Sequence, residues 1–226
     1  MNVFKSIYLL LFVLIAFTGQ AFAQVDQVAN PRAYNLIDES AIGTQDGEYG
    51  VPNGHQVGDI KMTNIDGEDV TMNELWGDQA LMVVFYRGGW CPYCNMQIRE
   101  LSEDYAAFEE QGVMPVLISV DKPDVAALTT ETYDIPFPVL SDSDLAAHEA
   151  FNVVYKLTDR EIERAESRGR DFADWSGRDH ETIAIASSFL VDSDGVVQWS
   201  TVLKDYTSRP TVEQLMTAIN DWKAGN

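Results

Sequence analysis

Two cysteines separated by two residues are the part of this sequence best suited to chemistry. Cys91 and Cys94 are the only cysteines among its 226 residues, and they enclose a Pro-Tyr pair. An apolar run at 80–86 precedes them, and an amphipathic run at 96–110 follows them. A Cys-x-x-Cys between a predicted strand and a predicted helix is typical of a redox-active dithiol.

The positions of the two cysteines predict different tasks for them. Pro92 suits the first position of a helix, because its φ angle is already helical and its missing N–H would have no partner there. Cys91 then lies at the N-cap, where free backbone N–H groups and the helix dipole favour a thiolate. Cys94 lies one turn further on, on the same face. We therefore expect Cys91 to attack and Cys94 to resolve the resulting mixed disulfide.

The residues around the pair extend this prediction. Arg87 places a second positive charge near the sulfur atoms. The neighbouring aromatic side chains are large enough to shield the sulfur atoms from bulk water. The candidate site therefore has Cys91, Cys94 and Arg87 as catalytic residues, surrounded by Tyr86, Trp90, Pro92 and Tyr93.

Two structural explanations compete with redox chemistry. One is an inert disulfide, and the other is half of a zinc site. A zinc site needs four ligands with suitable spacing, and the remaining candidates, His55, His148 and His180, are scattered along the chain. We therefore expect neither a metal ion nor another cofactor.

Residues 1–23 have the features of a secretory signal peptide. Lys5 supplies a positive charge, and an uninterrupted apolar stretch follows at 7–17. That stretch is too short to span a bilayer, and the small-x-small sequence at 21–23 provides a cleavage site before Gln24. The sequence therefore predicts an exported, periplasmic protein with no stable membrane association after cleavage. An uncleaved anchor is the alternative.

The composition argues against some partners and bounds the domain organisation. The chain has 36 acidic and 15 basic residues, which give a net charge of −21. This charge argues against binding to nucleic acid or to anionic membrane surfaces. The content of 46% hydrophobic residues is ample for an ordinary core. We expect one redox domain at 55–226, preceded by an extended arm or linker at 24–54.

The hydrophobic pattern predicts strands that alternate with helices. The arm contains at most a short helix around 33–40. A hairpin follows at 60–71 around an Asp-Gly turn, and a helical turn follows at 72–76. The later predicted strands are 80–86, 113–120, 137–140, 182–191 and 196–202, with a turn at 192–195, and the later predicted helices are 96–110, 124–133, 142–151 and 211–223. This alternation predicts an α/β fold with a largely parallel centre.

Residues 152–182 interrupt the alternation. A charged helix is predicted at 159–170, and a loop-like segment with Phe172, Trp175 and His180 follows it. We interpret the whole segment as an insertion that packs against the main domain and covers the active site. A solvated helix anchored by a few aromatic side chains is the alternative.

Four segments of the sequence resemble a known family. They are 85–95 around the two cysteines, 118–121, 137–142 and 188–195. Their order and spacing resemble the peroxiredoxin-like branch of the alkyl hydroperoxide reductase/thiol-specific antioxidant (AhpC/TSA) family, within the thioredoxin-fold superfamily. The resemblance covers about residues 55–222. It implies a thioredoxin-like fold, with a central mixed β-sheet flanked by helices.

The resemblance also implies a reaction and a partner. Cys91 corresponds to the peroxidatic thiol, which attacks a hydroperoxide and becomes a sulfenic acid. Cys94 corresponds to the resolving thiol, which condenses with the sulfenic acid to form a disulfide. A thioredoxin-like donor or another thiol reductant would then reduce that disulfide.

The sequence departs from the family pattern at several positions. Gly88 stands three residues before Cys91, where typical peroxiredoxins have Thr or Ser. Ala186 stands near the place where they have an arginine, just before the strand at 189–191. Thioredoxins have a buried acid where this chain has Phe85, and a cis-proline for which this chain has no counterpart. The sequence therefore matches neither the peroxiredoxin pattern nor the thioredoxin pattern in full.

Three functions are compatible with these features. The first is a peroxiredoxin-like peroxidase that reduces hydroperoxides. The second is a thiol-disulfide oxidoreductase that acts on protein cysteines, because Cys-Pro-Tyr-Cys is the pattern of glutaredoxins. The third is a non-catalytic binding module with an inert disulfide, which uses 152–182 as its contact surface. All three share one fold, and a fold does not decide among functions.

Overall fold

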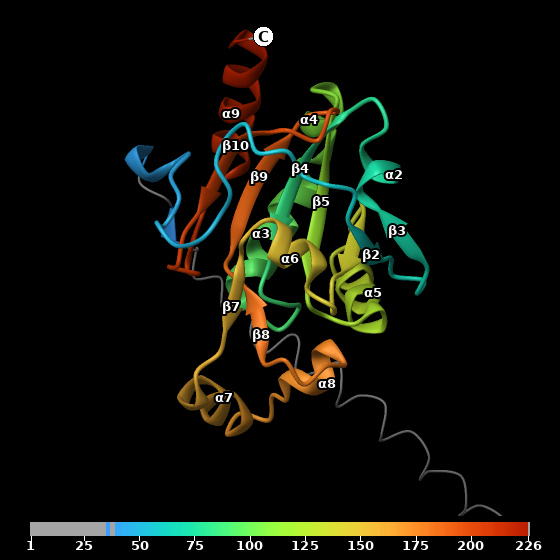
Figure 1. The fold of residues 1–226 in the computed structure, drawn as a ribbon, viewed down its shortest axis with the longest axis vertical. Helices are drawn as coiled ribbons and strands as arrows, with labels where there is room; N and C mark the ends of the chain where they lie inside the picture. Colours follow the sequence, from blue (N-terminus) through green and yellow to red (C-terminus); the bar gives the residue numbers. More distant parts are fainter. Residues whose placement is uncertain (1–34, 37–38, 226) are drawn as a thin grey trace, which may run out of the picture. The chain divides into compact units, whose positions relative to one another are not determined.

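The structure is a computed structural model that describes residues 35–36 and 39–225 (Figure 1). The predicted signal peptide at 1–23 lies outside these described residues. Among the described residues, no helix is both long and apolar enough to cross a membrane.

The centre of the fold is a mixed sheet of seven strands. Their order is β10 (Val197–Val202), β9 (Ser187–Val191), β4 (Ala80–Phe85), β5 (Val113–Ser119), β6 (Val139–Ser141), β2 (Lys61–Thr63) and β3 (Asp69–Thr71). The three central strands β4, β5 and β6 run parallel, and every other neighbouring pair is antiparallel. The predicted α/β fold with a mixed sheet is therefore confirmed.

Helices cover the central strands, which explains their continuous apolar sequence. All six residues of β4 are buried, as expected for a strand covered on both faces. Successive side chains of a strand point to opposite faces, and those of β4 enter two separate clusters. Leu81, Val83 and Phe85 pack with Phe151 and Phe189 on one face. The other cluster contains Ala80, Met82, Val84, Cys91, Cys94, Ile98, Leu101, Phe108, Leu215 and Ile219.

The helices of the main domain follow the predicted order. They are α2 (Met72–Trp76), α3 (Pro92–Glu103), α4 (Tyr105–Glu110), α5 (Pro123–Thr132), α6 (Ala146–Ala150) and α9 (Val212–Gly225). One difference concerns the helix predicted at 96–110, because α3 ends and α4 begins at Asp104. Aspartate is a weak helix former because its carboxylate competes for nearby backbone N–H groups.

Both predicted hairpins are present, and a side chain organises each turn. Asn64 Oδ1 accepts hydrogen bonds from two backbone N–H groups of the β2–β3 turn, at 3.0 and 2.9 Å. Asp192 Oδ1 does the same in the β9–β10 turn, at 3.0 and 2.8 Å. Short polar side chains that bond to the backbone two to four residues ahead favour such turns.

The segment predicted as an insertion has its own small sheet. β7 (Val154–Lys156) pairs antiparallel with β8 (Thr182–Ala184), and α7 (Asp159–Glu166) and α8 (Phe172–Ser176) lie between them in sequence. Figure 1 shows α7 and α8 together at one end of the central sheet. The single strand predicted at 182–191 is therefore wrong, because β8 belongs to this small sheet and β9 to the central one.

The arm contains short elements, one of which pairs with a strand near the end of the chain. At most a short helix was expected around 33–40, and in the structure Asn35–Leu36 form β1 and Glu39–Ala41 form the 3₁₀ helix η1. β1 pairs in parallel with β11 (Ser208–Arg209), a strand that the sequence did not predict. Two-residue strands are too short for hydrophobic periodicity to detect, yet β11 contains a residue of the site described below.

Candidate active site

Helix α3 begins as the sequence predicted. Cys91 is its N-cap residue, with φ −89° and ψ 113°, and Pro92 occupies the first helical position. The backbone N–H of Cys91 donates to Gly88 O at 3.0 Å. The Cys91 side chain, however, accepts no capping hydrogen bond from the first turn. The N–H groups that were expected to stabilise a Cys91 thiolate therefore do not contact its sulfur.

The chain enters α3 through a glycine pair that passes close to a buried carboxylate. Gly88 has φ 137°, a conformation that other residues rarely adopt. A Cβ atom at this position would lie 2.8 Å from Asp121 Oδ1, and the Gly89 N–H donates to Asp121 Oδ2 at 2.8 Å. The departure from the family pattern at Gly88 follows from this close approach, because no side chain fits there.

The sulfur of Cys94 is the one that receives hydrogen-bond donors. Cys94 is completely buried. The backbone N–H of Arg87 and Nη2 of Arg209 both donate to Cys94 Sγ, at 3.4 Å each. Burial opposes a charged sulfur, but the Cys91 thiol, the Arg209 guanidinium and the Arg87 N–H together lower the pKa of Cys94 to about 5.

The environment of Cys91, in contrast to that of Cys94, raises the pKa of its thiol. Only 1% of Cys91 is exposed. Burial raises the pKa of the Cys91 thiol well above its usual value, and the adjacent Cys94 raises it further. The sequence predicted a Cys91 thiolate, whereas the donors and charges in the structure favour a thiolate at Cys94.

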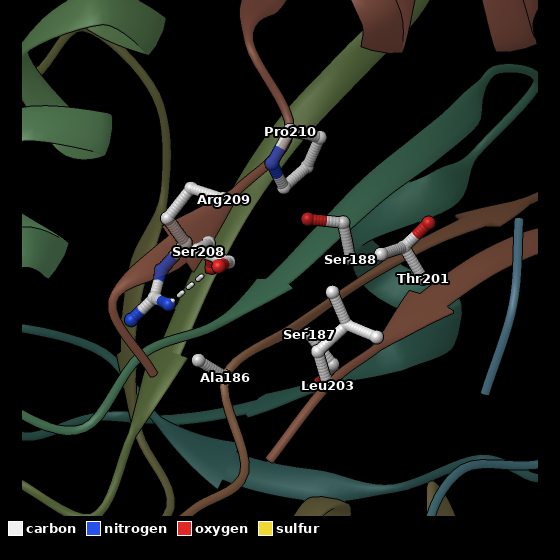
Figure 2. Close-up of a pocket in the computed structure, with 8 residues that line it drawn as sticks. All are labelled: Ala186, Ser187, Ser188, Thr201, Leu203, Ser208, Arg209 and Pro210. Carbon is white, nitrogen blue, oxygen red and sulfur yellow. Dashed lines mark hydrogen bonds between the residues drawn. The ribbon is translucent and has the colours of Figure 1, made fainter. Parts of the chain in front are cut away.

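Arg209 is a candidate site residue that the sequence prediction missed. Its guanidinium is held in place by a hydrogen bond from Nη1 to Ser208 O at 2.7 Å, and only 2% of the residue is exposed. It lines a small pocket whose other walls include Ala186 and several serine and threonine side chains. Figure 2 shows the Arg209 side chain extending toward Ala186, with Ser188 and Thr201 across the pocket. An arginine is thus present beside Ala186, but it comes from β11 rather than from the segment before β9.

A buried carboxyl group lies beside the dithiol. Asp121, two residues after the end of β5, is fully buried, and its Oδ1 has no hydrogen-bond partner among the described residues. Burial raises the pKa of Asp121 to about 7 against the lowering effect of the Gly89 N–H, and the charge of Cys94 raises it further. The sequence prediction also missed Asp121, because an aspartate after a strand is more often part of a solvent-exposed turn.

Aromatic rings and a second arginine lie near the pair. Tyr86 is buried, and Trp90 and Tyr93 are half-buried against the cluster that contains both cysteines. The guanidinium carbon of Arg87 lies 3.9 Å from the ring centroid of Tyr206, which the prediction did not include. The Tyr93 ring packs edge-to-face against Tyr206, with centroids 5.7 Å apart.

The metal alternative finds no support among the residues that the structure describes. They contain no group of three or more His, Cys, Asp or Glu side chains able to hold a metal ion. Of the three histidines, His148 forms a buried pair with Asp142, with Nδ1 and Oδ2 2.6 Å apart. His180 Nε2 lies 3.2 Å from Ser143 O.

Comparison with known proteins identifies the family. The sequence model of the AhpC/TSA family matches residues 53–200. The chain therefore belongs to the AhpC/TSA family, which confirms the resemblance seen in the sequence. Peroxidoxin BcpB from Mycobacterium tuberculosis has a similar structure, with a TM-score of 0.60 and 18% sequence identity over 77% of this chain and 97% of that protein. At this level of identity the similarity concerns the fold.

The curated relatives include two kinds of thiol protein. Thiol-disulfide oxidoreductase ResA of Halalkalibacterium halodurans is 24% identical over 101 residues, which cover 44% of this chain and 56% of ResA. Peroxiredoxin Bcp of Escherichia coli K12 is 28% identical over 133 residues, which cover 59% of this chain and 74% of Bcp. The chain thus spans little more than half the length of the first relative. The names of both relatives are consistent with a thiol-dependent enzyme. They do not decide between reduction of peroxides and thiol-disulfide exchange.

Replacing Asp121 should change how stability depends on pH. The carboxyl group has a pKa of about 7 in the folded protein against an ordinary value of 3.8. The contribution of Asp121 to the free energy of unfolding is fully present below about pH 4 and is lost as the pH rises through about 7. Relative to Asp121→Asn, the wild type should lose about 2 to 3 kcal/mol of unfolding free energy between pH 5 and pH 8. Urea unfolding of the reduced proteins measures this difference.

The stability of the wild type is compared with that of Asp121→Asn, rather than measured alone, because other groups also titrate. Cys94 has a lowered pKa, which changes stability in the opposite direction over this range. Asp78→Asn is the matched control, since Asp78 is exposed. If Asp121→Asn and Asp78→Asn have the same pH dependence as the wild type, Asp121 does not hold its proton as described.

Replacing Arg209 should weaken the Cys94 thiolate. In a Cys91→Ser background only one thiol titrates, and thiolate absorbance at 240 nm follows it. Arg209→Met removes the charge and keeps most of the buried stem, so the pKa of Cys94 should rise and alkylation at pH 6 should slow by about tenfold. Arg99→Met, an exposed arginine on α3, is the control. Identical titrations of the Arg209→Met and Arg99→Met proteins would contradict the assignment.

Proposed function

We propose that this protein is a peroxiredoxin-like thiol peroxidase that reduces hydroperoxides. One observation supports this proposal most directly. The Cys94 sulfur is completely buried, yet it receives a guanidinium N–H from Arg209. A thiolate stabilised by a fixed cation is the activated form of a cysteine, which attack on a hydroperoxide requires.

The proposed reaction begins at Cys94. Its thiolate attacks the outer oxygen of the hydroperoxide, an S–O bond forms, and the O–O bond breaks. The alkoxide leaves and takes up a proton to become an alcohol, and Cys94 becomes a sulfenic acid. The guanidinium of Arg209 is positioned to hydrogen-bond the oxygen atoms as charge moves onto the leaving group. Sulfur is oxidised in this step, and the hydroperoxide is reduced.

Cys91 completes the oxidative half of the cycle. Its sulfur attacks the sulfenic sulfur of Cys94, water leaves, and a disulfide joins the two residues. A thiol reductant, such as a thioredoxin-like protein, then returns both cysteines to the reduced state by thiol-disulfide exchange. These roles are the reverse of those that the sequence predicted, and the support for the reversal is the pair of N–H donors on Cys94.

A thiol-disulfide oxidoreductase acting on protein cysteines is the second candidate. It is favoured by the half-buried rings of Trp90 and Tyr93 beside the Cys-Pro-Tyr-Cys sequence, where a partner protein can dock. It is opposed by the burial of both sulfur atoms, with exposures of 1% for Cys91 and 0% for Cys94. A protein disulfide reaches such sulfur atoms only after the surrounding side chains move.

Rapid kinetics separate the two candidates. Reduced protein is mixed with hydrogen peroxide or cumene hydroperoxide, and tryptophan fluorescence is followed. Fast oxidation is expected in the wild type and in Cys91→Ser, which stops at a Cys94 sulfenic acid that dimedone labels. Cys94→Ser should react at least about a hundredfold more slowly, because the thiolate is lost.

The same variants decide the assignment of roles. Fast oxidation of Cys94→Ser with slow oxidation of Cys91→Ser would restore Cys91 as the nucleophile. Oxidation of the wild type no faster than that of a free thiol, combined with rapid reduction of insulin, would replace the peroxidase by the oxidoreductase.

We also propose that the protein is exported and acts in the periplasm. The support is the signal-like sequence of residues 1–23. The mass of the protein recovered after expression of the full chain should correspond to a chain that begins at Gln24. Recovery of the intact chain from the cytoplasm would contradict export.

A further inference from the structure

Two arginines beside the dithiol have no carboxylate partner. Among the described residues, neither Arg87 nor Arg170 forms an ion pair, whereas five other cations do, namely Lys61, Lys122, Lys156, Arg178 and Lys204. Arg209 differs from these two, because the Cys94 sulfur lies against it. The other described arginines without an ion pair, apart from Arg209, are exposed, whereas Arg87 and Arg170 are half-buried at one site.

Aromatic rings hold both guanidinium groups in place. The guanidinium carbon of Arg87 lies 3.9 Å from the ring centroid of Tyr206 and 5.3 Å from that of Trp90. The guanidinium carbon of Arg170 lies 5.3 Å from the same Trp90 centroid. Phe172 supports Trp90 edge-to-face, with centroids 5.4 Å apart. A guanidinium stacked on a ring keeps its N–H edge available for a planar anion such as a carboxylate.

The electrostatics of Arg170 favour an added anion. Burial, the neighbouring Arg168 and the charge of Arg87 all lower the pKa of Arg170, while Cys91 raises it. Glu161 is the acidic side chain of α7 that interacts with Arg87, and it does so only at longer range. Its carboxylate instead accepts hydrogen bonds from Thr158 and Tyr155. A bound anion would therefore compensate charges that the protein leaves uncompensated.

We propose that Arg87 and Arg170 form a binding site for a carboxylate of the substrate. The inference rests on the proposed function, and it defines the substrate class as small hydroperoxides that carry a carboxylate on an apolar or aromatic body. The body packs against Trp90, Tyr206 and Phe172. The insertion then contributes to specificity, because Arg170 and Phe172 both belong to it.

The test compares a neutral and an anionic probe of each kind. The first pair is cumene hydroperoxide and its 4-carboxylate derivative. The second pair is neutral 2,2′-dithiodipyridine and 5,5′-dithiobis(2-nitrobenzoate), an aromatic disulfide with a carboxylate on each ring. The rate ratio of the anionic to the neutral probe is measured for each pair with the reduced full-length protein. This ratio cancels changes in thiolate content that affect both probes equally.

Substitution of either arginine should lower the ratio. Arg170→Gln and Arg87→Gln should each reduce it by about fivefold at low salt, and by less at high salt. Arg168→Gln is the matched control, because Arg168 is exposed, has the same charge and lies two residues from Arg170. The rate with hydrogen peroxide should stay within about twofold in Arg168→Gln, which confirms that the control variant keeps the basal activity.

The outcomes separate this inference from the proposed function. Fast reaction with hydrogen peroxide and equal ratios in wild type, Arg170→Gln and Arg168→Gln would overturn the carboxylate site and leave the peroxidase intact. Slow reaction with every hydroperoxide, with an Arg170-dependent ratio for the two disulfides, would overturn the peroxidase and support the anion site.

Discussion

The proposed chemistry depends on one buried contact, between the Arg209 guanidinium and the Cys94 sulfur. A sulfur anion in an apolar interior is unfavourable unless a charge or a donor compensates it. Arg209 supplies that charge, and it can do so because β11 is fixed against β1 at Ser208 and Arg209. A two-residue strand near the end of the chain therefore supplies the positive charge that favours a thiolate at Cys94.

Asp121 sets a second constraint on the same site. Its carboxyl group is buried beside the turn that leads into α3, and the Gly89 N–H is its hydrogen-bond donor. The charge of Cys94 disfavours the charge of Asp121, so a Cys94 thiolate and a protonated Asp121 stabilise each other. The glycine pair makes this arrangement possible, because a side chain at Gly88 would collide with the carboxyl group.

The insertion connects the fold to the surface of the site. α8 is anchored by its N-cap residue Asp171, whose Oδ1 accepts from the backbone N–H groups of Ala173 and Asp174. This cap fixes the start of the helix, where Phe172 meets Trp90. The insertion therefore packs against the main domain at Trp90, with aromatic and cation–π contacts as the physical basis.

The sequence by itself determined the features that rest on local patterns. The Cys-Pro-Tyr-Cys sequence placed Cys91 at the N-cap of α3, and hydrophobic periodicity gave the buried strand β4, because these depend on residues close in the chain. The partners of the dithiol depended on tertiary structure, because Arg209 lies 115 residues from Cys94. Asp121 also reaches the site through tertiary structure, because β5 lies beside β4 in the sheet. Arg170 reaches it because the insertion packs against Trp90. The Arg209 contact that favours a Cys94 thiolate is therefore long-range, and no local pattern in the sequence records it.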